Sequence, residues 1–144
     1  MKGYLLDTNA VSLLYNGRAS ASFEEWLRQR FRENALFLSS ITILEIQKGI
    51  TKLELVKGGS PARARALQSW LQGLVLQYEN SIIVVDVDVA FAAGRLEGTM
   101  IARGHNADLA DLLIAATAQT HNLTVVTANI KDFEALEVAC LAPF

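Results

Sequence analysis

The sequence predicts an α/β fold, a three-layer sandwich in which helices flank a central, mainly parallel sheet of four or five strands. Short apolar and β-branched runs alternate along the chain with longer segments whose apolar residues recur every three or four positions. That alternation is typical of a parallel sheet covered by helices on both faces. No repeat, low-complexity tract or Pro/Ser-rich linker interrupts it, so we expect residues 1–144 to form a single domain.

Composition narrows the class of protein. Hydrophobic residues make up 51% of the 144 positions and charged residues 19%, a balance that supports a packed core and argues against disorder. No apolar run approaches the roughly 20 residues that a membrane-spanning helix needs, so we expect no membrane partner. Cys140 is the only cysteine, which excludes an internal disulfide and fits a cytoplasmic location.

Five short segments are expected to be strands. The run at 82–85 is rich in β-branched residues, as buried strands are. The chain ends soon after the last segment, at Pro143 and Phe144. The expected strands are residues 4–6, 36–38, 82–85, 124–126 and 138–141.

The helices are expected from apolar periodicity and from the residues that begin them. Ser22 with Glu25 resembles a capping box, and Ser60 with Pro61 is a typical helix start. Asp88 and Asp108 are expected to cap two later helices. The expected helices are residues 10–15, one that follows Ser22, residues 42–56, one from Pro61 to about residue 78, one from Asp88 to about residue 103, and residues 109–120. After the strand 124–126 we expect a loop that Phe133 anchors in the core.

Polar residues follow two of the expected strands directly. Asp7 comes after the first strand, and Thr127, Asn129 and Asp132 come after the strand 124–126. Ligands of open parallel sheets bind beyond the carboxyl ends of the strands. These residues are therefore expected to lie at one edge of the sheet.

Two more acids lie on helices among apolar neighbours. Asp111 is in the first turn of the apolar helix 109–120, and Glu45 lies within the helix 42–56. A charge in apolar surroundings needs a partner. Together with Asp7, these acids form an oxygen-only set, which suits Mg²⁺, and Mn²⁺ can substitute.

Each of these acids also has an ordinary structural interpretation. Asp7 can cap a helix, Asp111 can complement a helix dipole, and Glu45 can pair with Lys48 one turn later. Asp132 can be a solvated loop residue. We assign structural roles to Asp86 and Asp88 and surface positions to His105 and His121.

Four segments of the sequence resemble the PIN-domain family, and within it the VapC-type and FitB-type toxins. They read LLDTN at 5–9, SITILEIQKGI at 40–50, ADLLIAATA at 110–118 and VVTANIKDF at 125–133. Each segment is short, but the four occur in the family's order and spacing over nearly the whole chain. Two positions depart from the pattern: Asn129 is an amide where many relatives have an acid, and Ala142 replaces a common asparagine.

The resemblance implies a magnesium-dependent endoribonuclease that is the toxin of a toxin–antitoxin pair. It implies metal binding by Asp7, Glu45 and Asp111, with Asp132 as a weaker fourth candidate. From their place directly after the strand 124–126, we predict that Thr127 and Asn129 position the attacking water or the scissile phosphate. The resemblance also implies a homodimer and a VapB-like antitoxin that occupies the active-site groove. We expect the dimer to form through residues 67–78 and 96–101. The candidate RNA-binding residues are Asn9, Lys48, Arg95, Arg103 and Lys131.

Two other functions remain open from the sequence. One is a PIN fold that has lost catalysis and serves as an RNA-binding or scaffolding module, for which Asn129 leaves room. The other is a haloacid-dehalogenase-like phosphatase, whose first strand also ends in an aspartate. That chemistry needs a second acid two residues after the nucleophile, where this chain has Asn9.

Overall fold

The computed structural model describes residues 2–144, so Met1 of the expected domain lies outside the described residues. The strands form one sheet in the order β3-β2-β1-β4-β5, and every pair of neighbours is parallel. This sheet confirms the predicted fold class. The strands are β1 Gly3–Leu6, β2 Leu36–Ser39, β3 Ile82–Ile83, β4 Leu123–Val126 and β5 Cys140–Leu141.

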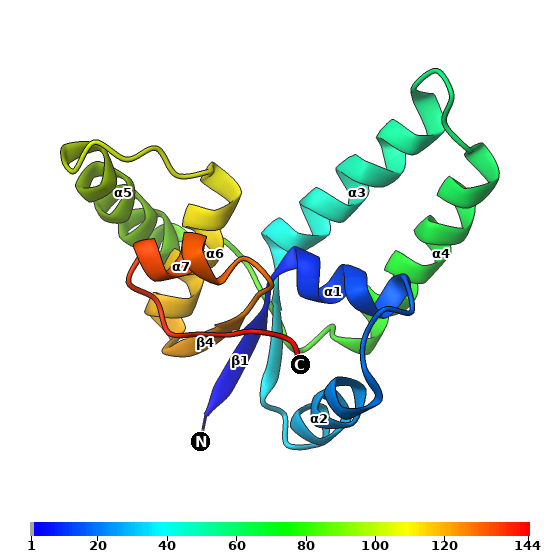
Figure 1. The fold of residues 1–144 in the computed structure, drawn as a ribbon, viewed down its shortest axis with the longest axis horizontal. Coiled ribbons are helices and arrows are strands. Elements are labelled where there is room, and N and C mark those ends of the chain that lie inside the picture. Colours follow the sequence, from blue (N-terminus) through cyan, green and yellow to red (C-terminus); the bar gives the residue numbers. More distant parts are fainter. Residues whose placement is uncertain (1) are drawn as a thin grey trace.

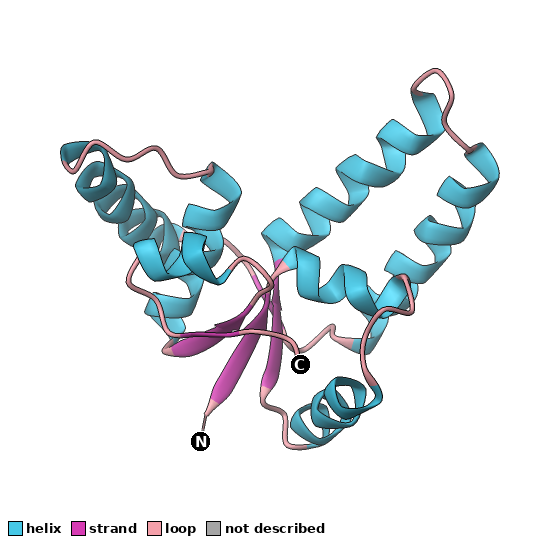
Figure 2. Cartoon of the chain, viewed as in Figure 1, coloured by secondary structure: helices cyan, strands magenta, loops and turns pink. Residues whose placement is uncertain are grey.

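Seven helices within residues 2–144 connect and cover these strands (Figure 2). In Figure 1, the α3–α4 hairpin extends to one side of the sheet, whereas α5, α6 and α7 lie on the other. No helix in the described part of the chain is long and apolar enough to cross a membrane. The helices are α1 Thr8–Tyr15, α2 Ala21–Arg32, α3 Ser40–Leu55, α4 Pro61–Gln77, α5 Val87–Ala102, α6 Leu109–His121 and α7 Ile130–Ala135.

Alternating strand residues divide the core into two layers. Leu6 and Val126 face a cluster with α1, α2 and α4, and their neighbours Leu5 and Val125 face a second cluster with α6 and α7. Successive side chains of a strand point to opposite faces, so both faces of the sheet are buried. The result is the expected three-layer sandwich.

The capping residues of two helices differ from the sequence prediction. Ser20, and not Ser22, caps α2, because its hydroxyl accepts a hydrogen bond from Phe23 N at 3.0 Å. Asp86, and not Asp88, caps α5, and its carboxylate accepts from Val89 N at 3.0 Å. In both cases two suitable residues lie two positions apart. The residue whose backbone stays extended becomes the cap.

The residues after β4 form a helix where we expected a loop. α7 spans only six residues, too few for a 3.6-residue period to be visible in the sequence. Phe133 is fully buried, as predicted, and fixes this helix against the second core cluster. The other differences are at the ends of elements. α1 and α3 begin two residues earlier than expected, at Thr8 and Ser40, while β3 stops at Ile83 and β5 begins at Cys140.

Candidate active site

The carboxyl ends of β1 and β4 meet at the point where the strand order reverses. From β1 the chain builds outward through β2 and β3, and then it returns to the other side of β1 with β4. Leu6 pairs with Val126, and Asp7 N donates to Val126 O at 2.9 Å. Asp7 and Thr127 therefore lie side by side, at the position where open α/β sheets bind ligands.

Asp7 is held by three hydrogen bonds. Its Oδ2 accepts from Thr127 Oγ1 at 2.9 Å and from Asn9 Nδ2 at 2.7 Å, and its Oδ1 accepts from Thr8 N at 2.8 Å. The last bond also makes Asp7 the cap of α1, so the structural interpretation holds beside the functional one. The carboxylate is only 3% exposed. Burial raises its pKa, against the hydrogen bonds, and the nearby charge of Glu45 raises it further.

Asn9 ties the loop after β4 to Asp7. Besides its bond to Asp7, its Oδ1 accepts from Ala128 N at 2.8 Å. Asn129 N in turn donates to Thr127 Oγ1 at 2.9 Å. We expected Asn9 to contact RNA, but the structure engages both ends of its amide with protein atoms.

Glu45 reaches the same edge from α3. Its Oε1 accepts a 2.6 Å hydrogen bond from Thr8 Oγ1, the residue directly after Asp7. The alternative ion pair with Lys48 is not formed, since no contact between the two side chains lies within 4.0 Å among the ion pairs of residues 2–144. Glu45 is half-buried and turned toward α1.

Asp111 lies close enough to four other carboxylates for their charges to act on its pKa. Its pKa is raised to about 6, first by burial and then by the charges of Asp7, Asp108, Asp132 and Glu45. Asp108, Asp111 and Asp132 line one cavity, to which both α6 and α7 contribute side chains. The short helix α7 places Asp132 on this wall, whereas we had expected Asp132 to reach the site only through a folded-back loop. Asp108 was assigned as a cap alone, yet its side chain makes no capping hydrogen bond.

The donor atoms at this edge are of the kind that magnesium prefers, although they form no ready-made coordination shell. Within residues 2–144, no three acidic, histidine or cysteine side chains approach closely enough to hold a metal ion. The side chains nearby offer carboxylate, amide and hydroxyl oxygens. Mg²⁺ keeps several waters and needs only one or two direct carboxylates, and the mutual repulsion of these acids favours a bound cation.

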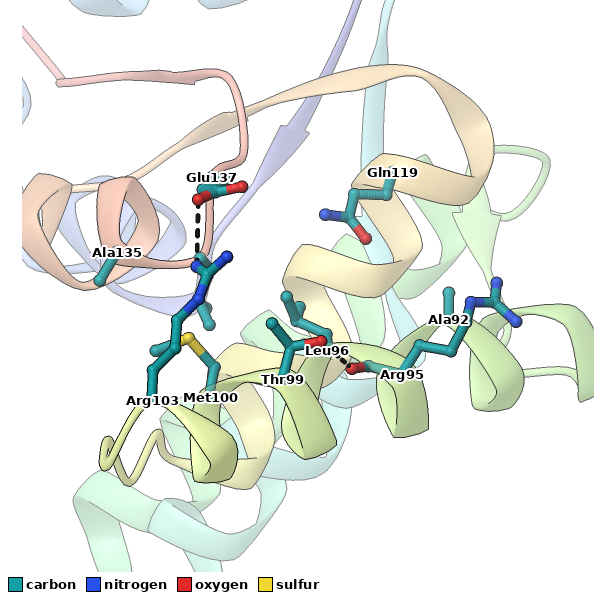
Figure 3. Close-up of a pocket in the computed structure, with 10 residues that line it drawn as sticks. Ala92, Arg95, Leu96, Thr99, Met100, Arg103, Gln119, Ala135 and Glu137 are labelled. Carbon is teal, nitrogen blue, oxygen red and sulfur yellow. Dashed lines mark hydrogen bonds and ion pairs between the residues drawn. The ribbon is translucent and has the colours of Figure 1, made fainter.

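The cations expected to bind RNA fall into two groups. Lys48, one turn after Glu45 on α3, and Lys131, next to Asp132 in the sequence, are exposed. Arg95 and Arg103 instead line a separate cavity between α5, α6 and α7 (Figure 3). There Arg103 pairs with Glu137 at 3.1 Å, and Arg95 points away from both of them.

Sequence reasoning missed a cation and two hydroxyls near the acids. Arg63 lines a cavity together with Thr8 and Glu45, although it lies on a different helix. Thr42 is fully buried one turn before Glu45, and its hydroxyl lies 3.4 Å from that of Thr8. Only the packing of α1 and α4 on α3 brings these residues together. His105 and His121 are exposed, as predicted.

Comparison with known proteins identifies the family. The PIN domain matches residues 4–138 of the chain. The chain belongs to the PIN-domain family. Toxin FitB of Neisseria gonorrhoeae is 31% identical over 97% of both chains. VapC ribonuclease Y4jK of Sinorhizobium fredii is 28% identical over 97% of this chain and 96% of its own.

Solved structures of the family share the fold. The FitAcB complex from Neisseria gonorrhoeae contains a chain with a TM-score of 0.80 and 30% identity, matched over 97% of both chains. A chain of VapBC2 from Rickettsia felis, bound to promoter DNA, has a TM-score of 0.80 and 28% sequence identity, matched over 96% of this chain and 97% of its own. The similarity therefore covers the acids at both ends of the sequence.

Proposed function

We propose that this PIN-domain protein is a magnesium-dependent endoribonuclease and the toxin of a toxin–antitoxin pair. The observation that carries the proposal is the position of Asp7, buried at the switch point of the sheet and within electrostatic reach of Glu45 and Asp111. The names of relatives, VapC ribonuclease and tRNA(fMet)-specific endonuclease VapC of Salmonella typhimurium, support an activity on RNA.

The side chains divide the work of phosphodiester hydrolysis. Asp7, Glu45 and Asp111 would hold magnesium, with Asp132 beside Asp111. Bound magnesium activates a water and offsets the charge of the attacked phosphate. Thr127 is fully buried and its hydroxyl donates to Asp7 Oδ2, so it would hold that carboxylate rather than the water or phosphate that the sequence suggested. Asn129, exposed after β4, would orient the water or the phosphate.

The basic contacts to RNA come from the lysines that flank the acids. Lys48 and Lys131 are exposed beside Glu45 and Asp132, and each neutralises part of the phosphate backbone. Arg63 adds a third cation on the Glu45 side. Arg95 and Arg103 contribute less, because their cavity contains none of the proposed ligands.

The proposed partners are a VapB-like antitoxin and a second copy of the chain. The relatives' structures named FitAB and VapBC support such a complex. The apolar stripe expected to form part of the dimer surface at 67–78 is used within the chain, because Leu71, Leu74 and Tyr78 pack in its core. The other expected surface, at 96–101, lies on α5, where Val87, Phe91 and Ile101 are exposed, and the proposed dimer uses that helix.

The alternatives are less well supported. An inactive scaffold would not need to keep three acids within electrostatic reach of one another. A phosphatase of the haloacid-dehalogenase type would need an acid at Asn9, whose amide here holds Asp7.

The proposal is tested by incubating the purified chain, freed of any antitoxin, with single-stranded RNA and mapping the new ends. We expect cleavage with Mg²⁺ or Mn²⁺, none after chelation, and recovery when Mg²⁺ is restored. Glu45→Gln, purified in parallel, controls for contaminating nuclease. RNA binding without cleavage by the wild-type chain would favour the inactive scaffold, and cleavage that persists in the chelator would exclude the metal.

A further inference from the structure

Thr8 contacts the two acids that lie on different elements. Its backbone N–H donates to Asp7 Oδ1 at 2.8 Å, and its hydroxyl donates to Glu45 Oε1 at 2.6 Å. Asp7 follows β1, and Glu45 lies in α3, 38 positions further along the chain. One residue therefore bridges the carboxylates that the proposed function assigns to the metal.

The direction of the Thr8 hydroxyl follows from its surroundings. A hydroxyl has one hydrogen, and a carboxylate can only accept, so the 2.6 Å contact to Glu45 must use the hydrogen of Thr8. The hydroxyl of Thr42 is fully buried and lies 3.4 Å away, a long contact that leaves the hydrogen of Thr8 to Glu45. Thr42 lies one turn before Glu45 on the same face of α3, so the contact fixes Thr8 against that helix.

Glu45 needs such a contact because like charges surround it. The charge of Glu45 raises the pKa of both Asp7 and Asp111, so each of these carboxylates repels the others. A half-buried glutamate on a helix has three rotatable bonds and open solvent within reach. A charge-assisted hydrogen bond from a hydroxyl opposes that repulsion and keeps the carboxylate turned inward.

We propose that Thr8 is a positioning residue whose hydroxyl holds Glu45 beside Asp7, so that both carboxylates meet an incoming divalent cation in a fixed arrangement. This inference rests on the proposed function, because it assigns Glu45 to that site. In this role Thr8 acts on the carboxylate of Glu45 and not on the RNA itself. Its contribution passes entirely through Glu45, and any side chain that carries a hydroxyl at the same place should supply it.

The test compares Thr8→Val, which keeps the shape and removes the hydroxyl, with Thr8→Ser, which keeps the hydroxyl. Ser12→Ala is the matched control, because Ser12 lies one turn later on α1, lines the same cavity and donates only to Thr8 O at 3.0 Å. The Mn²⁺ affinity of the full chain is measured by calorimetry for each variant. RNA turnover at saturating Mg²⁺ and thermal unfolding are measured on the same preparations. Crystal structures without metal show where the Glu45 carboxylate lies.

We expect Thr8→Val to weaken Mn²⁺ binding about 10-fold or more, the scale found for groups that orient metal ligands. Thr8→Ser and Ser12→Ala should stay within about twofold of the wild type, on the same reasoning that only the oriented hydroxyl matters. In the metal-free crystals, the Glu45 carboxylate should leave its place in Thr8→Val alone. Equal Mn²⁺ binding by Thr8→Val and the wild type, or a Thr8→Ser variant as weak as Thr8→Val, would overturn the assignment.

Failure of the proposed function would look different. A wild-type chain that neither binds Mn²⁺ nor cleaves RNA contradicts the nuclease, and the metal-free crystals then decide on Thr8 alone. A Glu45 carboxylate that is displaced in Thr8→Val but not in Thr8→Ser would still support its positioning by Thr8. An unmoved carboxylate in both variants would refute that role. If Thr8→Val does not fold, Thr8→Ala, which leaves room for water, takes its place.

Discussion

The two sides of the acidic edge are built differently. Asp7 and Glu45, which follow β1 and lie on α3, are fixed by hydrogen bonds from Thr8, Asn9 and Thr127. On the other side, no side-chain hydrogen bond of Asp111 or Asp132 is present among residues 2–144. Asp111 responds instead to the charges around it, which raise its pKa to about 6.

This difference suggests a division of labour. The hydrogen-bonded side, defined by Asp7 and Glu45, is already arranged before any cation arrives, so little ordering is needed there on binding. The side defined by Asp111 and Asp132 lacks such hydrogen bonds, its acids repel one another, and it therefore gains most from a cation. Substitutions on the two sides should therefore have different consequences.

The largest effect is expected for Asp7→Asn. RNA cleavage should fall more than about 100-fold, beyond the usual loss for residues that only support metal ligands. Thermal unfolding should be unchanged or slightly higher, because the substitution removes a buried charge with a raised pKa. Turnover and unfolding are measured on the same preparation. A variant that unfolds at much lower temperature would show that Asp7 serves mainly as the cap of α1.

A smaller effect is expected for Asn9→Ala. The substitution removes the bonds to Asp7 and to Ala128 N, so it frees the loop after β4 from the hydrogen-bonded side. We expect turnover to fall about 10- to 100-fold. KM for a short RNA should change little, which steady-state kinetics can separate from kcat. A rise in KM alone would restore the sequence-based assignment of Asn9 to RNA binding.

Substitutions of Asp132 and Asn129 test which of these two residues, both in the segment after β4, belongs to the metal site. The sequence favours Asn129, but the structure places Asp132 in a cavity with Asp111, while the Asn129 side chain is exposed and makes no capping bond. Asp132→Asn should raise the magnesium concentration needed for half-maximal turnover about 10-fold, as for other groups near a metal. Asn129→Ala should change it less. The reverse order would place Asn129, and not Asp132, at the metal.

The smallest effect concerns pH. A pKa of about 6 in the folded protein, against 3.8 ordinarily, means that the folded state binds the Asp111 proton more tightly than the unfolded chain does. Stability of the metal-free protein should therefore rise as pH falls from 7 toward 4, by roughly 2–6 °C in Tm. Asp111→Asn should raise Tm at pH 7 and flatten this dependence. If the Tm of Asp111→Asn varied with pH in the same way as that of the wild type, burial and repulsion of the Asp111 carboxylate would not be the cause.

Much of the fold and part of the site could be predicted from the sequence. The parallel sheet followed from alternating periodicities, and the placement of Asp7 beside Thr127 followed from the rule for strand ends. α7 was not predicted, because a helix of six residues is too short to show a helical period in the sequence. Without this helix, the prediction placed Asp132 too far from Asp111, whose cavity it in fact shares.

The hydrogen bond from Thr8 to Glu45 and the position of Arg63 in the same cavity could not be read from the sequence for a different reason. Both depend on which faces of α1 and α4 pack against α3, and sequence spacing does not fix that choice. The same limit explains the expected dimer surface on α4. The stripe that ends at Tyr78 was correctly recognised as apolar, but the protein uses it for its own core.

The most direct test is the crystal structure of the full chain with and without Mn²⁺, located by its anomalous scattering. We expect manganese between Asp7 and Asp111, with the hydrogen bonds of Thr8, Asn9 and Thr127 unchanged and with the side chains of Asp111 and Asp132 shifted toward the ion. Manganese elsewhere, or an ion that binds only after the bonds to Asp7 are broken, would contradict the account.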